Sequence, residues 1–144
     1  MDTLKYNRIL IAVDGSKHSL NIAEKGLTLA RQLKAEVAII FVIDKSKAMG
    51  SVDANITPEE AEILLKKEAI YIMDSIASTF GYNDFIRFMP VGYPKEDIIK
   101  ISDTWHADVI VIGRHGKSGI INILMGSVAE YVLYHSHKIV MLVK

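Results

Sequence analysis

The sequence predicts a single α/β domain in which a parallel sheet is covered by helices on both faces. Three strongly apolar segments, residues 9–13, 36–43 and 108–112, lack the polar alternation of half-buried strands. Such runs are typical of strands buried on both faces of a parallel sheet. Helical patterns lie between the strands, so consecutive strands are expected to form right-handed βαβ units.

Bulk composition fits one compact domain that spans residues 1–144. A chain of 144 residues buries about two-thirds of its unfolded surface. The 17 basic and 17 acidic side chains give zero net charge, which argues against a nucleic-acid or anionic-membrane partner. Without cysteine, disulfides and thiolate metal sites are excluded. The N-terminal segment has no apolar signal core, so we expect a cytoplasmic location.

The first half of the chain places polar residues at the ends of two strands. Asp14-Gly15-Ser16 follows the first strand with turn chemistry, and a helical pattern then runs to Lys34-Ala35. The second strand is followed by a polar loop over residues 44–56. Because ligands bind at the carboxyl ends of parallel strands, Asp14, Ile43 and Asp44 are expected at the functional edge.

Two helices have clear start signals. Thr57-Pro58-Glu59-Glu60 combines an N-cap, an N1 proline and a capping-box glutamate, so a helix is predicted from there to about Phe80, stopped by Gly81. Its expected apolar side consists of Ile63, Leu64, Ile70, Met73 and Ala77. Ser127-Val128-Ala129-Glu130 predicts a second capping box, with Ser127 as N-cap of the last helix.

The remaining elements complete a five-stranded pattern. A weaker third strand is expected over residues 85–91, and Arg87 suggests that it lies at an exposed edge. Gly92-Tyr93-Pro94 opens a short helix that ends near His106. A fifth strand covers residues 138–144. Five strands that alternate with four helices predict a doubly wound parallel sheet with helices on both faces.

The segment GRHGKSGIINILMGS, residues 113–127, is the strongest functional signal. It joins a buried strand to a helix, and its glycines allow backbone N–H groups to approach an anion at the helix N-terminus. Gly113, Gly116, Gly126 and Ser127 therefore form a candidate phosphate cradle, although a turn glycine and an N-cap serine would also explain the last two. Arg114, His115 and Lys117 are either phosphate contacts or ordinary solvated loop residues.

Two common phosphate motifs do not fit this segment. A P-loop needs a glycine five residues before Gly116, where Val111 stands, and GxGxxG fails because two residues separate Gly113 from Gly116. His135 and His137 have HxH spacing, but residues two apart on a helix do not face each other. Cationic side chains are in any case expected at a helix C-terminus.

The spacing Gly113-x-x-Gly116, nine residues, then Gly126-Ser127 resembles the signature of the universal stress protein family, in its ATP-binding branch. ILIAVDGS at residues 9–16 and GSVAEYVLYHS at residues 126–136 resemble the first and last parts of that fold. The resemblance implies strand order 3-2-1-4-5. It also implies further site residues on the first, second and fourth strands and on the last helix.

By this resemblance, Asp14 lies near the ribose or a metal such as the Mg²⁺ of Mg-ATP; an Asx-turn is the alternative from its position. The backbone of Ala12 and Val13 lines the pocket, and the backbone of Val42 or Ile43 meets the adenine edge. Ile112 packs nearby, and Val128 contributes a backbone contact after Ser127.

The sequence thus predicts an ATP-binding stress-response or regulatory protein, a nucleotide-dependent switch with little or no turnover, with Mg²⁺ or Mn²⁺ as candidate counter-ions. No Walker lysine, evident catalytic base or metal cluster stands out. The alternative is a slow ATP hydrolase or a phosphoryl- or adenylyl-transfer enzyme that uses Asp14 and Lys117. A scaffold without ligand is a third hypothesis, and a protein partner stays open.

The final strand predicts a homodimer. Residues 139–143 are apolar throughout, yet in the order 3-2-1-4-5 this strand lies at an edge with unpaired backbone groups. Soluble proteins usually cover such edges. Two copies that pair antiparallel about a two-fold axis would do so, and the family resemblance points the same way. The alternatives are that Lys138 and Lys144 guard the edge, or that the strand is not at the edge.

Overall fold

A computed structural model describes residues 4–115 and 125–144 of the chain. Its centre is a five-stranded sheet in the order β4-β2-β1-β6-β7, and all neighbouring strands are parallel. The predicted order 3-2-1-4-5 is therefore confirmed, because these are the five main strands numbered along the chain. The strands are β1 (Arg8–Ala12), β2 (Glu36–Ile40), β4 (Ile86–Phe88), β6 (Val109–Gly113) and β7 (Ile139–Val143).

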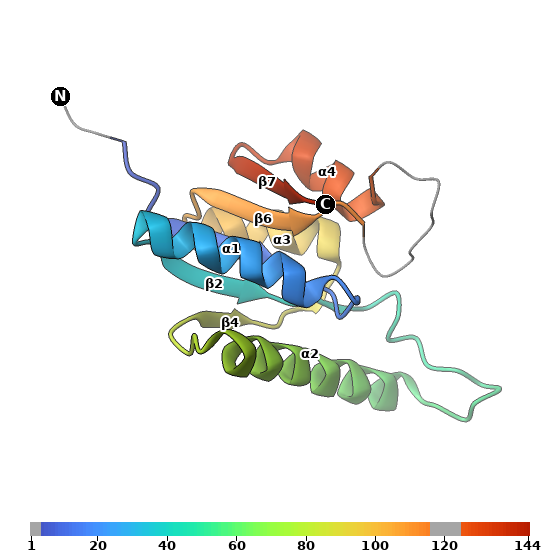
Figure 1. Ribbon diagram of the computed structural model, residues 1–144. Helices are drawn as coiled ribbons and strands as arrows, with labels where there is room; N and C mark the ends of the chain where they lie inside the picture. The colour runs from blue at the N-terminus through green and yellow to red at the C-terminus, as the bar shows by residue number, and fades with distance from the viewer. Residues whose placement is uncertain (1–3, 116–124) are drawn as a thin grey trace.

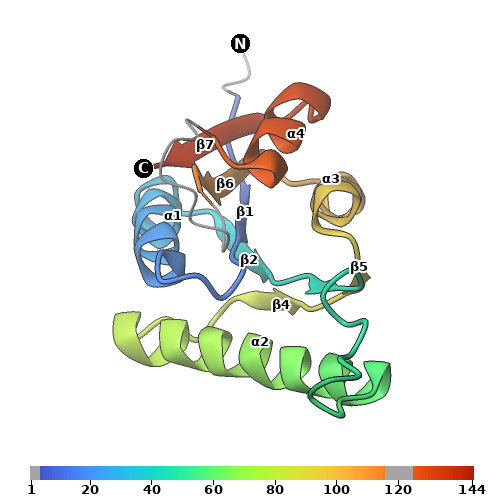
Figure 2. The same ribbon diagram turned by 90° about the vertical axis from the view of Figure 1, so that its right-hand side faces the viewer.

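Helices cover both faces of the sheet, as predicted (Figures 1 and 2). Alternate residues of β1 point to opposite faces, so Ile9 and Ile11 pack in one apolar cluster and Leu10 and Ala12 in the other. The first cluster includes residues of α1 and α2, and the second includes residues of α3 and α4. The helices are α1 (Ser19–Leu33), α2 (Pro58–Phe80), α3 (Pro94–Thr104) and α4 (Ser127–His135).

The second and third strands are each shorter than predicted and continue in a separate two-stranded sheet. This small sheet consists of β3 (Ile43–Asp44) paired in parallel with β5 (Val91–Gly92). Pro90 lies at the break between β4 and β5, where it has no N–H to donate to a ladder. Its carbonyl oxygen still accepts a hydrogen bond from the N–H of Ile43 at 2.7 Å.

The capping box at the start of α2 is confirmed. The Thr57 hydroxyl accepts from the N–H of Glu60 at 3.1 Å, and the Glu60 carboxylate accepts from the N–H of Thr57 at 3.3 Å. Gly81 ends the helix in the left-handed region, with φ of 58°. Within the described residues, no helix combines the length and the apolar character that crossing a membrane requires.

The second predicted capping box is wrong. Gly126 is the N-cap of α4, with extended φ and ψ of −68° and 156°, and its side chain offers no cap. Ser127 is already the first helical residue, because the N–H of Glu130 bonds to the carbonyl of Gly126 at 3.0 Å. A capping serine would have to stand at position 126, one residue before Ser127, so the residues 127–130 do not form a capping box.

The predicted apolar side of α2 is only partly correct. Met73 and Ala77 are buried, but Ile63, Leu64 and Ile70 are 52%, 55% and 45% exposed. Figure 1 shows that the N-terminal part of α2, the part to which Ile63 and Leu64 belong, extends past the ends of the strands. Ile70 is exposed for a different reason, because it lies beside the fully buried Ala69 at the rim of the stripe that packs inward. Burial against the sheet falls instead on Ala69, Met73, Ile76 and Ala77.

These two helix starts give a testable contrast in stability. Thr57→Ala removes a side-chain cap, so the free energy of unfolding should fall by about 1 kcal/mol. Ser127→Ala should change it by less than about 0.5 kcal/mol, because the Ser127 side chain is exposed and makes no cap bond. Urea denaturation of both variants measures this difference, and equal losses would contradict the assignment of Gly126 as N-cap.

Candidate functional site

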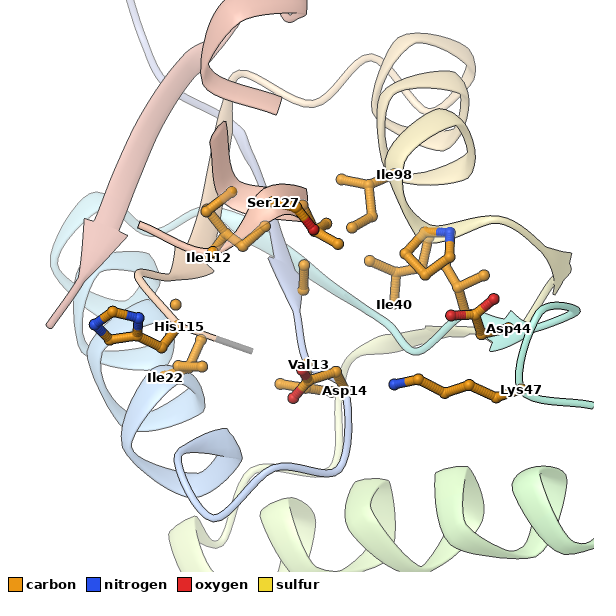
Figure 3. Close-up of a pocket in the computed structure, with 17 residues that line it drawn as sticks. Val13, Asp14, Ile22, Ile40, Asp44, Lys47, Ile98, Ile112, His115 and Ser127 are labelled. Atoms are coloured by element: carbon orange, nitrogen blue, oxygen red, sulfur yellow. The ribbon is translucent and has the colours of Figure 1, made fainter. Parts of the chain in front are cut away.

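A pocket of about 280 Å³ opens at the carboxyl ends of β1, β2 and β6 (Figure 3). The chain runs from β1 to β2 on one side and β6 pairs on the other side of β1, so the strand order reverses here. Open α/β sheets hold their ligands in the crevice at such a switch point. The pocket is lined by Ala12, Val13, Asp14, Ile22, Ile40, Val42, Asp44, Lys47, Pro94, Ile98, Ile112, Gly113, His115, Gly126, Ser127, Val128 and Ala129.

Strand register brings three of these residues to the same level. Ala12 pairs with Ile40 on one side and with Ile112 on the other. All three belong to the apolar cluster on the α3 and α4 side of the sheet. The predicted residues Ala12, Val13 and Ile112 therefore line the pocket, and Ile40, which sequence reasoning missed, could have been found from this register.

Asp14 combines the two roles that its sequence position left open. One carboxylate oxygen, Oδ1, accepts a hydrogen bond from the N–H of Ser16 at 3.0 Å, which is an Asx-turn. The residue also lines the pocket. A carboxylate has two oxygens and about four acceptor positions, so the turn leaves capacity for a ligand donor.

Val42 and Ile43 face opposite sides of the chain, and only Val42 lines the pocket. Ile43 is fully buried in the cluster formed with α1 and α2, and its N–H bonds to Pro90. Successive residues of an extended chain point in opposite directions. Of the two alternatives for the adenine edge, the structure therefore places Val42 in the pocket.

Gly113 and His115 form the wall next to α1. A Cβ on Gly113 would lie only 2.6 Å from Cδ1 of Ile22, so the glycine allows this close packing of α1 on the end of β6. The Nε2 atom of His115 accepts from Nε of Arg114 at 3.1 Å. A neutral imidazole with an accepting Nε2 carries its proton on Nδ1, so His115 can donate from that nitrogen.

Arg114 lies outside the main pocket. It lines a small adjoining hollow together with His18, Asn21 and Lys144. Its backbone is held between neighbouring segments, because its N–H bonds to Val143 at 2.7 Å and its carbonyl accepts from Gly126 at 2.6 Å. Gly116 and Lys117, the other predicted loop contacts, fall outside the described residues.

The N-terminus of α4 completes the polar end of the pocket through Gly126, Ser127 and Val128. The first N–H groups of a helix have no partner within the helix, and no side chain of the described residues caps them. Together with the positive end of the helix dipole, these groups favour an anion. The three predicted residues thus line the pocket, although Ser127 does so without acting as the N-cap.

The opposite end of the pocket is apolar. Ile40, Val42 and Ile98 are at least 92% buried, and Pro94 adds the start of α3. This end is flanked by Asp44, the last residue of β3, and by Lys47 in the loop that follows. Sequence reasoning placed Asp44 at the edge but missed Ile22, Lys47, Pro94, Ile98 and Ala129, because only tertiary packing brings α1, α3 and this loop together.

Metal ligands are sparse in this site. Across residues 4–115 and 125–144, no group of three or more histidine and acidic side chains is positioned to hold a metal ion. Asp14 could contribute a carboxylate to an ion that a phosphate ligand carries with it.

Comparison with known proteins places the chain among similar sequences and folds. The model of the universal stress protein family matches residues 5–144. Universal stress protein MJ0531 of Methanocaldococcus jannaschii is 35% identical over 142 residues, which cover 96% of this chain and 82% of the relative. Universal stress protein MJ0577 of the same organism is 35% identical over 161 residues, with 99% and 97% of the two chains covered.

Solved structures agree with the sequence matches. The structure of MJ0577 superposes with a TM-score of 0.81 at 34% identity, covering 98% of this chain and 97% of that one. The fold is also shared with the universal stress protein from Archaeoglobus fulgidus in complex with dAMP, with a TM-score of 0.67, 24% identity and 98% and 100% coverage. From the family match over nearly its whole length and from these relatives, the chain belongs to the universal stress protein family.

Proposed function

We propose that this protein binds ATP in the pocket at the ends of β1, β2 and β6 and acts as a nucleotide-dependent regulatory protein. The observation that carries the proposal is the arrangement of one pocket with an apolar end, an anion-favouring end and Asp14 between them. A nucleotide has the same sequence of parts: an apolar base, a ribose with hydroxyl donors and a phosphate chain. The Archaeoglobus fulgidus protein was solved with dAMP, so this fold can hold an adenine nucleotide.

The proposed orientation follows from the chemistry of the two ends. Adenine packs between Ile40, Val42 and Ile98, and the ribose hydroxyls donate to the free oxygen of Asp14. The phosphates lie against Gly113, His115 and the N-terminus of α4. In this proposal Gly116 and Lys117 extend the phosphate cradle, and Mg²⁺ or Mn²⁺ accompanies the phosphates near Asp14.

Binding can be tested at Gly126, whose extended backbone suits any residue. A Val side chain at this position would fill space beside the helix N-terminus. Gly126→Val should therefore weaken ATP binding at least about tenfold, a loss of about 1.4 kcal/mol, while Gly126→Ala should weaken it less. Isothermal titration calorimetry with ATP and with adenosine measures this, and adenosine should be affected much less because it has no phosphate.

Thermal denaturation is the control for these variants, since an intact fold is needed for the comparison. Wild-type protein that shows no heat at millimolar ATP would refute nucleotide binding. A Gly126→Val protein that binds ATP as tightly as wild type would instead place the phosphates away from α4.

Slow hydrolysis or a transfer reaction is the second candidate function, since Asp14 lies in the same pocket as the proposed phosphates. We expect turnover far below one per second, because Asp14 already accepts from the N–H of Ser16 and, in this proposal, from the ribose, so it is not positioned as a base for water. Incubation with Mg-ATP for hours, followed by chromatography of ATP and ADP, measures the rate. Turnover above about one per second, the lower range of ordinary enzymes, would favour the enzyme.

We also propose that two copies pair through the free edge of β7. The N–H of Ile139 bonds toward β6 at 3.3 Å, and the carbonyl of Val143 accepts from Arg114 at 2.7 Å. Because backbone groups of alternate residues point to opposite sides of a strand, Val140 and Leu142 present theirs to the open edge. The apolar side chain of Ile139 is 47% exposed. A second β7 would therefore cover this side chain and also pair the outward backbone groups of Val140 and Leu142.

This geometry selects the variant that tests the dimer. Val140→Pro removes an outward N–H and leaves the β6–β7 ladder intact, so it should yield folded monomers. Met141→Pro removes an inward donor and is expected to destabilise the fold as well, while Val140→Ala is the matched control that should stay dimeric. Light scattering coupled to size exclusion measures the mass. A monomeric wild type at tens of micromolar, or dimeric Val140→Pro, would refute this interface.

A further inference from the structure

The loop after β3 brings a lysine to the pocket that the family signature does not include. Lys47 lines the pocket although it lies in the loop between β3 and α2. In Figure 3 its side chain extends toward Asp14, and His115 lies on the opposite side of the pocket. Lys47 and His115 are the only lining side chains with a basic nitrogen among the described residues.

The turn that carries Lys47 is held firmly in place. The N–H groups of Lys47 and Ala48 both bond to the carbonyl of Asp44 at 3.0 Å. The Asp44 carboxylate accepts from the N–H and the hydroxyl of Ser46 at 3.0 and 2.7 Å. The N–H of Lys45 bonds to Gly92 at 2.8 Å, which ties the turn to β5. The backbone thus presents Lys47 at a defined point of the pocket wall.

The pocket contains acidic side chains whose charge Lys47 can offset. Asp14 and Asp44 are the acidic lining residues, and their carboxylates would repel a phosphate chain. Among residues 4–115 and 125–144, the Lys47 ammonium forms no ion pair within 4 Å with either of them. The exposed ammonium is therefore not held by either of these carboxylates, and it can act on a charged ligand from the edge of the pocket.

We propose that Lys47 is a nucleotide-binding residue that offsets Asp14 and Asp44 and so makes the pocket selective for nucleoside polyphosphates over nucleosides. This inference rests on the proposed function, since it concerns the same pocket. The lysine charge interacts more strongly with a ligand that carries several negative charges than with a neutral one. Its contribution to binding should therefore rise in the order adenosine, AMP, ATP.

The test compares these three ligands by calorimetry in four proteins. Lys47→Met keeps a similar length and loses the charge, Lys47→Arg keeps the charge, and Lys45→Met is the matched control. Lys45 lies in the same loop and is exposed, but it does not line the pocket. Lys47→Met should weaken ATP binding about three- to tenfold and change adenosine binding less than twofold, with AMP between them.

The controls separate a specific charge from other effects. Lys47→Arg should keep ATP binding within about twofold, and Lys45→Met should match wild type. The difference between wild type and Lys47→Met should shrink with added salt, because salt screens exposed charges. Thermal unfolding should be the same in all four proteins, since the Lys47 side chain is exposed.

Three results would overturn the inference. They are unchanged ATP affinity in Lys47→Met, an equal loss for ATP and adenosine, and an equal loss in Lys45→Met. In each of these cases wild-type protein still binds ATP, so the proposed function would stand without Lys47. A wild type that binds none of the three ligands would refute the proposed function itself and this inference with it.

Discussion

The position of β1 between two parallel neighbours is the constraint on which the rest of the structure depends. Parallel pairing sets the register on both sides, so Ala12 lies level with Ile40 and with Ile112. The three strands therefore end at the same edge of the sheet, and the backbone leaves each of them there. The N–H of Val13 still bonds to Ile40 at 3.0 Å, which fixes the backbone up to the residue before Asp14. The floor of the pocket follows from this pairing.

The same pairing decides which side of the sheet the pocket takes. Ala12, Ile40 and Ile112 point toward α3 and α4, whereas Ile9, Ile11 and Ile39 point toward α1 and α2. A ligand at the ends of these strands thus meets the N-termini of α3 and α4 on one side. It meets Ile22 of α1 on the other, because Gly113 allows α1 to approach closely.

Sequence patterns were sufficient where the structure depends on local chemistry. Continuous apolar runs located the central strands, and Thr57 and Glu60 located the start of α2, because a capping box involves only neighbouring residues. Ser127 shows the limit of such patterns: it fits a capping box, but the chain enters α4 one residue earlier, through Gly126. Exposure of Ile63, Leu64 and Ile70 had other causes, because the N-terminal part of α2 extends past the strands and the stripe that packs inward runs through Ala69, Met73 and Ile76.

One wall of the pocket could not be predicted from sequence patterns. It forms because the second and third predicted strands are each interrupted and pair again as β3 and β5. A straight second strand would have carried residues 41–43 along the main sheet. Instead, Pro90 interrupts the third strand, and the chain pairs again as β3 and β5, with Asp44 level with Gly92. Gly92 directly precedes Tyr93 and Pro94 at the start of α3, and it packs against the Asp97 carboxylate without room for a Cβ. The small sheet thus joins the loop of Lys47 to the start of α3. Both become walls of one site through pairing between Asp44 and Gly92, which are 48 positions apart in the sequence (92 − 44).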